Sequence, residues 1–259
     1  MKIKEVIYDI CHWNNLEYNE ESVDKYYSGS EENEVTRVVV TMFASIEVIR
    51  KAIDLGAELL IVHEPTYYSN EETIDLENPA HKEKVRLLEE SGLTIFRYHN
   101  HPHHMAEDFI DIATIKHSKL KGKITGKFHW AVTGFELDEP MTAEEVRCAL
   151  RDNLNAKWTR VAGETDKKGK VIAFACGTPG NLMNMLLNDK IDFIVTGEAC
   201  EWIYCEMVKD LASIGKNKAL IVMGHCRSEY AGMIEVAERL QKNYSNLEVY
   251  HIESGDAYK

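Results

Sequence analysis

The chain has 259 residues, of which 30 are basic and 43 acidic, so its formal net charge is −13 with neutral histidines. Because nucleic acids are bound largely through lysine and arginine, this acidic excess argues against a nucleic-acid partner. Hydrophobic residues make up 44% of the chain and charged residues 28%, a balance that excludes a disordered polypeptide and predicts one or two domains with a buried core.

No apolar run approaches the roughly 20 residues that a membrane-spanning helix needs. The first residues mix lysines with aliphatic side chains and do not resemble a targeting segment. We therefore predict a cytoplasmic protein without a membrane partner. The six cysteines are scattered and form no Cys-x-x-Cys pair, so we expect most of them to be buried thiols.

Apolar runs alternate with helical patterns through the first half of the chain. Residues 5–16 carry apolar side chains on one helical face. Ser45 can cap a later helix and Pro79 can open another. Buried strands are expected on either side of these two helices, at 36–41, 58–62 and 93–98. This βαβαβ order is typical of a parallel sheet covered by helices.

A second alternating set begins near residue 125. Strands are expected at 130–137, 170–176, 192–195, 219–223 and 247–252. Helices are expected at 142–152, after Pro179, at 199–211 and at 228–240. The fold class that we predict is α/β, with two interlinked α/β domains whose mixed, largely parallel sheets are covered by helices.

We expect residues 1–125 plus 215–259 to form a metal-binding domain. Residues 126–214 are expected to form a second α/β domain. The lysine-rich stretch 116–127 can be the passage between two α/β units or an exposed surface loop.

Polar clusters follow the predicted strands directly, at the point where each strand ends. They lie at 63–65, 99–104, 177–180, 196–198 and 224–229. In open parallel sheets, ligands bind at the carboxyl edge of the strands. Imidazoles and carboxylates that converge there can hold one or two metal ions.

The segment 99–104 is the strongest of these signals, because four of its six residues are histidines. A lone histidine such as His63 is more often a solvated or core residue than a ligand, and a histidine-rich loop can be adventitious. A second pair, His225 and Glu229, lies four residues apart and would share one helical face. The two signals together favour a metal site.

Other polar residues allow two interpretations each. The turn Gly177-Thr178-Pro179-Gly180 could present backbone N–H groups to a phosphate, but it lacks the lysine of a P-loop and can be a simple tight turn. Glu198 and Glu201 could act as acid and base or support metal ligands, or could only interact favourably with a helix dipole. Cys226 could be a soft ligand or a buried thiol.

Several of these segments carry a family resemblance. In chain order they are His-Glu-Pro at 63–65, the histidine-rich turn at 99–104, "CGTPG", "DFIVTGEACEW" and "GHCRSE". Their order and spacing resemble the Nif-three-like dinuclear metal-centre proteins, also labelled GTP cyclohydrolase I type 2 homologues. The likeness spans nearly the whole chain, which is similar to the short form of that family.

The resemblance implies six metal ligands, at His63, Glu64, His99, His103, His225 and Glu229. Two of these depart from the family pattern. Glu64 stands where the family has the second histidine of a His-His-Pro motif, and His103 stands where it has an aspartate. The departures look like an exchange of one imidazole and one carboxylate between neighbouring ligand positions, which leaves the total charge of the site nearly unchanged.

The resemblance also implies a toroidal homohexamer with two divalent metal ions per subunit. Imidazole and carboxylate ligands suit zinc, iron, manganese or nickel. The leading hypothesis is a metal-dependent hydrolase of an unknown small-molecule substrate, in which two ions lower the pKa of a shared water and His101 or Glu198 moves protons.

Two alternatives remain from the sequence. The first is a non-catalytic metal-binding protein with a regulatory or scaffold role. The second takes residues 99–104 as a relative of the metallo-β-lactamase pattern His-x-His-x-Asp-His. In that reading His103 stands in the place of the aspartate, and the βα alternation disagrees with a β-sandwich.

Overall fold

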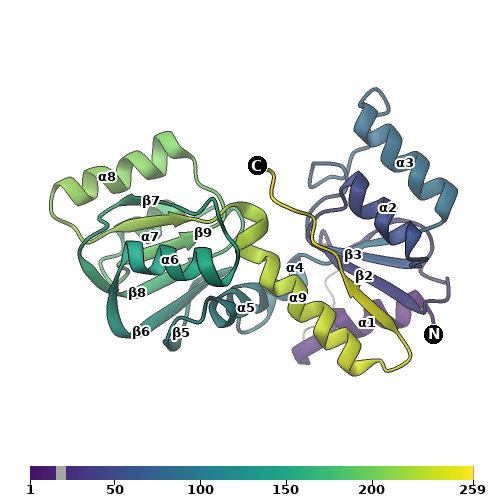
Figure 1. The fold of residues 1–259 in the computed structure, drawn as a ribbon, viewed down its shortest axis with the longest axis horizontal. Helices are drawn as coiled ribbons and strands as arrows, with labels where there is room; N and C mark the ends of the chain where they lie inside the picture. Colours follow the sequence, from purple (N-terminus) through teal and green to yellow (C-terminus); the bar gives the residue numbers. More distant parts are fainter. Residues whose placement is uncertain (16–21, 259) are drawn as a thin grey trace. The chain divides into compact units, whose positions relative to one another are not determined.

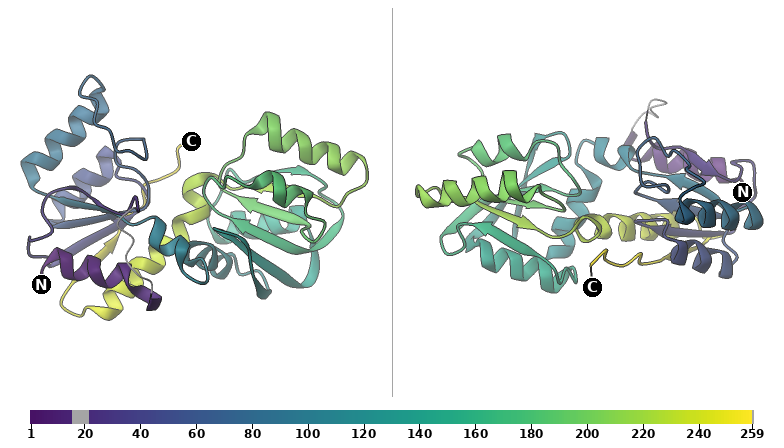
Figure 2. Two further views of the ribbon diagram at one scale, coloured as in Figure 1. Left: turned by 180° about the vertical axis from the view of Figure 1, so that it is seen from behind. Right: turned by 90° about the horizontal axis from the view of Figure 1, so that it is seen from above.

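A computed structural model describes residues 1–15 and 22–258 of the chain. These residues form two compact units, Met1–Met105 with Met233–Gly255 and Ala106–Gly232 with Asp256–Lys259. Each unit contains one mixed sheet with helices packed on it (Figures 1 and 2). The predicted α/β fold class is therefore confirmed. The extent of a metal-binding domain over 1–125 and 215–259 stays a prediction.

The sheet of the first unit has the strand order β1-β4-β3-β2-β11. Its strands are β1 Tyr26–Ser28, β2 Arg37–Thr41, β3 Leu59–Val62, β4 Thr94–Arg97 and β11 Glu248–His251. Strands β11, β2, β3 and β4 run parallel, and β1 is antiparallel to β4. Every residue of β3 and β4 is buried, as expected for central parallel strands.

The helices of the first unit follow the sequence signals closely. They are α1 Ile3–Cys11, the short 3₁₀ turn η1 Trp13–Asn15, α2 Ile46–Asp54, α3 Pro79–Ser91 and α4 Asn100–His104. The Ser45 hydroxyl caps α2 by accepting the Val48 N–H at 3.2 Å, and Gly92 ends α3 with a φ of 69°. The helix expected over 5–16 ends earlier, at Cys11, and Leu16 lies outside the described residues.

The sheet of the second unit has the strand order β5-β6-β8-β9-β10-β7. Its strands are β5 Gly122–His129, β6 Val132–Thr142, β7 Arg160–Gly163, β8 Lys168–Ala175, β9 Phe193–Thr196 and β10 Ala219–Val222. Strands β8, β9 and β10 are parallel, and the remaining pairs are antiparallel.

Helices cover both faces of the second sheet. They are α5 Phe109–Ser118, α6 Ala143–Asn153, α7 Leu182–Leu187, the π-helix η2 Glu201–Cys205, α8 Glu206–Ser213 and the first turns of α9 His225–Asn243, whose residues from Met233 onward belong to the first unit. Val146 and Leu150 of α6 share one apolar core with Phe193 of β9. Val208 of α8 packs in a second core with the neighbouring strand residue Ile194. The alternation of side chains along each strand explains why one strand supplies both cores.

One expectation about local structure was wrong, and two expected helices begin at other residues or in another form. The lysine-rich stretch 116–127 is neither a linker nor a loop, because it forms the end of α5 and most of the exposed edge strand β5. Edge strands that face water lack an apolar pattern, so β5 gave no strand signal. The helix expected over 199–211 begins as the π-helix η2. The helix expected from 228 begins at His225.

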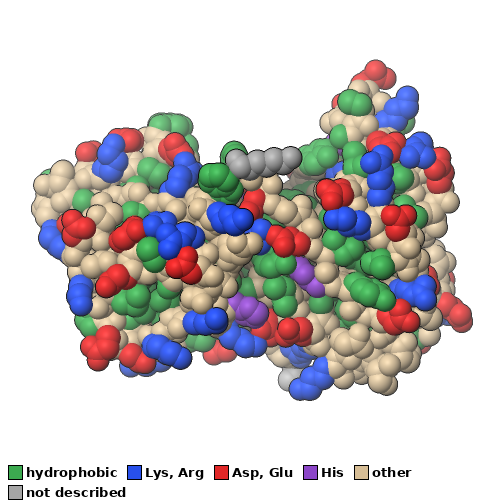
Figure 3. Space-filling view, in the orientation of Figure 1, with side chains coloured by type: hydrophobic (Ala, Val, Ile, Leu, Met, Phe, Trp, Pro, Cys, Tyr) green, Lys and Arg blue, Asp and Glu red, His purple; other side chains and the backbone are tan. Residues whose placement is uncertain are grey.

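The surface carries a mixture of acidic and basic side chains. On the face drawn in Figure 3, acidic and basic side chains are interspersed over both units. None of the helices in the described part of the chain has the length and hydropathy of a membrane-spanning segment.

Candidate metal centre

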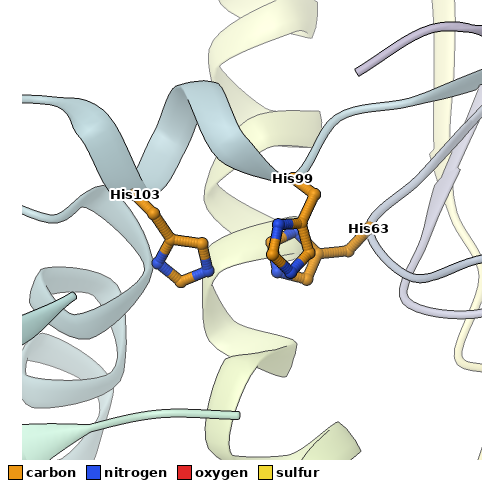
Figure 4. A group of neighbouring side chains, drawn as sticks. All are labelled: His63, His99 and His103. Carbon is orange, nitrogen blue, oxygen red and sulfur yellow. The ribbon is translucent and has the colours of Figure 1, made fainter. Parts of the chain in front are cut away.

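The histidine cluster, which we define as His63, His99 and His103, forms where two parallel strands of the first unit end. Strands β3 and β4 pair so that Val62 is opposite Arg97. His63 follows β3 directly, and His99 lies two residues beyond β4. The two rings stack with centroids 4.5 Å apart and planes 25° apart. The His103 ring lies 5.3 Å from His63 and 5.2 Å from His99 (Figure 4).

Both stacked rings have their Nδ1 atoms next to hydrogen-bond acceptors. His63 Nδ1 is 3.0 Å from the Tyr98 carbonyl oxygen, and His99 Nδ1 is 2.9 Å from the side-chain oxygen of Asn100. An N–H group at each Nδ1 would satisfy these acceptors and leave Nε2 available to bind a metal ion. One ligand atom from each ring of the cluster, His103 included, lies within 4.8 Å of the other two. Three imidazoles placed in this way fit one divalent ion.

Asp24 organises the backbone of the histidine-rich segment. Its buried carboxylate accepts the N–H groups of His99 at 2.8 Å, Asn100 at 2.7 Å and His101 at 2.8 Å, and also the ring Nδ1–H of His101. Burial by itself would raise the pKa of Asp24, but the hydrogen bonds from His101 and the backbone outweigh it and hold that pKa below its usual value. The anion takes the place of a side-chain cap, which α4 lacks.

The histidines of the segment 99–104 have different surroundings. His103 is 4% exposed and belongs to the histidine cluster. His101 is buried, bonds to Asp24 and stands outside the cluster. His104 is exposed, and its Nδ1 lies 2.8 Å from the Asn100 carbonyl oxygen.

Glu64 lies beside the histidine cluster with its two carboxylate oxygens in different surroundings. Oε1 is 3.9 Å from His99 Nε2, and Oε2 is 3.7 Å from Arg97 Nη2. The residue is 7% exposed. The backbone N–H groups of His63 and Glu64 both donate to the Met42 carbonyl, at 3.2 and 3.0 Å. These bonds tie the end of β3 to the end of β2.

Buried charges hold the loop that follows β3. Glu72 accepts the N–H of Thr66 at 2.8 Å and that of the next residue at 2.7 Å. Lys84 donates to the Thr66 carbonyl at 2.5 Å, and Arg97 Nε donates to the His63 carbonyl at 3.2 Å. Burial lowers the pKa of Lys84 to about 8 and raises the pKa of Glu72. The loop that carries His63 is thus held by side chains that are themselves fixed in the core.

A second group, which we call the His225 cluster, forms in the second unit from the residues after β8, β9 and β10. His225 opens α9, and its Nδ1 lies 2.8 Å from Glu198 Oε1 and 3.1 Å from Thr178 Oγ1. Its Nε2 lies 3.2 Å from Glu229 Oε2, one helical turn along α9. Because α9 begins at His225, both residues belong to its first turn.

The contacts of the His225 ring require an additional proton or a cation. A neutral imidazole carries one ring proton, yet both ring nitrogens of His225 face carboxylate oxygens. A second ring proton, a proton on the buried Glu229 carboxyl or a cation beside Glu229 would balance this contact. A histidine whose Nδ1–H bonds to a carboxylate and whose Nε2 faces an ion is the usual arrangement in metal sites. The donor set therefore fits a divalent ion.

Gly177 provides the space that Glu229 occupies. Its φ is +69°, and a Cβ atom there would lie 2.3 Å from Glu229 Oε1. Its N–H donates to Ser228 Oγ at 2.9 Å. The "CGTPG" turn thus packs closely against the first turn of α9, which agrees with the interpretation of a tight turn.

Two cysteines near the His225 cluster, Cys176 and Cys226, are buried thiols. Burial, and then the nearby carboxylates of Asp111 and Glu229, raise the pKa of the Cys176 thiol well above its usual value. This thiol stays protonated and is a poor metal ligand. Glu201, one of the two glutamates considered for acid–base work, pairs instead with Arg160 at 2.6 Å on the surface.

The sequence did not identify the residues that hold the possible metal ligands in place. These residues are Asp24, Glu72, Lys84 and Arg97. Asp24 lies far from the histidine-rich segment in the chain, so no spacing rule points to it. Arg97 could have been noticed in the sequence, because it is a charged residue inside the apolar run 93–98. A charge in a buried strand usually has a partner or a function.

The chain is similar to known proteins both in sequence and in structure. The sequence model of the family described as Duf34/NIF3 (NGG1p interacting factor 3) matches residues 1–256. A protein of Clostridium perfringens named "GTP cyclohydrolase 1 type 2 homolog" is 24% identical over 219 residues, which cover 83% of this chain and 81% of that protein.

Solved structures of the same fold include Staphylococcus aureus protein SA1388 and HcgD from Methanocaldococcus jannaschii. SA1388 has a TM-score of 0.77 and 18% identity, over 100% of this chain and 98% of its own. HcgD has a TM-score of 0.75 and 18% identity, over 97% of each chain. At these identities the two structures establish a shared fold alone.

Proposed function

This chain belongs to the Duf34/NIF3 family, and from that membership and its two donor clusters we propose that it binds two divalent metal ions. The proposed ligands are His63, Glu64, His99, His103, His225 and Glu229. The observation that carries the proposal is the histidine cluster, whose three ligand atoms lie within 4.8 Å of one another. Zinc, iron, manganese and nickel all suit this combination of imidazole and carboxylate.

We propose further that the protein is a metal-dependent hydrolase of a small molecule. Divalent ions, when bound, supply Lewis acidity and lower the pKa of water. Of the two candidate proton carriers, Glu198 is better placed than His101. The side chain of Glu198 is 55% exposed and can exchange protons with solvent, whereas His101 is buried and bonded to Asp24. A cytoplasmic location and a toroidal homohexamer remain predictions from the sequence.

One observation favours a second candidate, a non-catalytic metal-binding or scaffold protein. His63 is fully buried and His103 is 4% exposed, so two of the three imidazoles of the histidine cluster are shielded from solvent. Saturated and closed coordination is typical of structural sites, whereas a catalytic site keeps an open position for water or substrate.

Metal analysis of untagged protein tests the metal proposal. After incubation with zinc, iron, manganese or nickel and removal of loose ions, we expect about two equivalents in the wild type, fewer in His103→Ala and fewer in His225→Ala. His104→Ala is the matched control, because His104 is adjacent but exposed, and it should keep the wild-type content. No retained metal in the wild type, or equal loss in His104→Ala, contradicts the proposal.

Turnover separates the two candidate functions. We would screen metal-loaded protein against phosphoesters, nucleotides and cyclic amides. Hydrolysis that His225→Ala abolishes supports the hydrolase. Metal retention without any such turnover, together with no exchangeable water on the bound ion, supports the non-catalytic protein.

A further inference from the structure

Glu64 is a buried carboxylate beside the histidine cluster. A carboxylate is costly to bury without a partner, whereas an imidazole can be neutral. A glutamate buried at this position therefore requires a compensating group nearby. With Oε2 3.7 Å from the Arg97 guanidinium and Oε1 3.9 Å from His99 Nε2, each end of the carboxylate has a distinct neighbour.

Arg97 is the cation that meets this requirement. It is the last residue of β4 and is 1% exposed. Nε donates to the His63 carbonyl at 3.2 Å and Nη2 donates to Asn70 Oδ1 at 3.0 Å, so the guanidinium is fixed from two sides. Nη1 is buried and makes no hydrogen bond within the described residues. The guanidinium is therefore not saturated by its contacts with the loop.

We propose that Arg97 is a positioning residue for Glu64. Its guanidinium holds Oε2 on the side away from the histidines and leaves Oε1 directed at the histidine cluster. The inference rests on the proposed metal-binding function, and it makes Glu64 and Arg97 act as one unit beside the histidine cluster. Arginine suits this role better than lysine, because its planar guanidinium group can donate hydrogen bonds to two partners at fixed angles.

A simpler explanation is that Arg97 only stabilises the loop after β3. Lys84 separates the two explanations, because it is also a buried cation that holds this loop. Its Nζ donates to the Thr66 carbonyl and lies 4.2 Å from the centroid of the Tyr68 ring. A loop effect should appear in Lys84→Met as well as in Arg97→Met, whereas a positioning effect requires Arg97 and Glu64 together.

A double-mutant cycle on metal affinity tests the proposal. Zinc dissociation constants would be measured by chelator competition for the wild type, Arg97→Met, Glu64→Gln and the double variant. We expect Arg97→Met to weaken binding about 10- to 100-fold in the wild-type background, as for other residues that orient ligands. In the Glu64→Gln background the same change should cost less than about twofold, because its target carboxylate is gone. Lys84→Met should stay within about twofold of the wild type.

A spectroscopic measurement supplements the affinities. Absorption of bound Co²⁺ reports the ligand geometry, and we expect its visible bands to change in Arg97→Met and to stay unchanged in Lys84→Met. The double variant removes both buried charges and is therefore the variant with the best prospect of folding. If Arg97→Met does not fold, Arg97→Lys replaces it. A wild-type Co²⁺ spectrum and zinc affinity in Arg97→Lys would then overturn the proposal.

The outcomes distinguish this inference from the proposed function. A wild-type protein that binds no zinc overturns both. A wild-type protein that binds zinc, with equal losses for Arg97→Met in both backgrounds, overturns the role of Arg97 alone. Equal losses in Arg97→Met and Lys84→Met also overturn it, in favour of loop stabilisation.

Discussion

The Asp24 carboxylate accepts both the backbone N–H and the ring N–H of His101, across a sequence separation of 77 residues. The same carboxylate accepts the N–H groups of His99 and Asn100. One buried anion thus fixes the start of α4, and with it two members of the histidine cluster, His99 and His103. Asp24, which precedes the edge strand β1, thereby fixes the positions of the histidines that follow β4.

Replacing Asp24 by asparagine should destabilise the first unit. The amide keeps one oxygen acceptor but loses the charge and the second oxygen, and hydrogen bonds to a charged group contribute about 1.5–3 kcal/mol each. We expect the free energy of unfolding, measured with urea, to fall by at least that amount, and zinc affinity to fall as well. Asp54→Asn is the control, because Asp54 is exposed at the end of α2, and it should resemble the wild type.

The effect of Asp24→Asn should also depend on pH. The pKa of Asp24 in the folded protein lies below its usual value, so its carboxylate stabilises the fold above about pH 4, and this contribution disappears as the pH falls through the folded pKa. The stability gap between wild type and Asp24→Asn should therefore narrow in acid. A gap that is constant from pH 7 to pH 3 would show that the charge of Asp24 contributes nothing.

Lys84 should make stability depend on pH in alkaline solution, because its charged form is disfavoured in the folded protein. Its pKa in the folded protein is about 8, below the ordinary value of 10.5. Below pH 8 the burial of the charged amine costs stability, and between pH 8 and about 10.5 the unfolded chain binds the extra proton, so the free energy of unfolding rises with pH. Relative to Lys84→Met, the wild type should gain up to about 3 kcal/mol over this range. Parallel pH profiles of the two proteins would contradict the expectation.

A methyl group at Gly177 should disturb the His225 cluster. The Cβ of Gly177→Ala would meet Glu229 Oε1 at 2.3 Å in a left-handed backbone conformation, and such strain costs about 1–3 kcal/mol. We expect lower stability in urea and a lower metal content. Gly180→Ala lies in the same turn with nothing within 4 Å of its added Cβ. Equal behaviour of the two variants would mean that Gly177 does not set the position of Glu229.

Glu198 should tune the metal affinity of His225. Glu198→Gln removes the carboxylate 2.8 Å from His225 Nδ1, and loss of such a partner typically lowers metal affinity about 10- to 100-fold. Glu201→Gln is matched in chemistry and lies on the same stretch of chain, but its partner is Arg160. Zinc competition titrations should separate the two variants, and identical constants would exclude an orienting role for Glu198.

Local signals in the sequence were sufficient for most helices and central strands. The Ser45 cap starts α2 as expected, and the capping box of Thr142 and Glu145 starts α6 where a helix was expected. The apolar runs at 58–62 and 93–98 are β3 and β4. These features depend on residues within a few positions of one another, so a linear sequence contains them. Strands β1, β5 and β7 were missed because short or exposed strands carry no such pattern.

The sequence by itself determined that imidazoles and carboxylates follow the ends of buried strands, since that depends on strand periodicity and residue order. The tertiary structure decided which of them meet. In the folded chain His103 belongs to the histidine cluster, whereas His101 and His104 do not. His101 bonds to Asp24 instead, and His104 faces solvent. Such choices depend on strand order and on contacts between residues distant in the chain, and no local pattern encodes either.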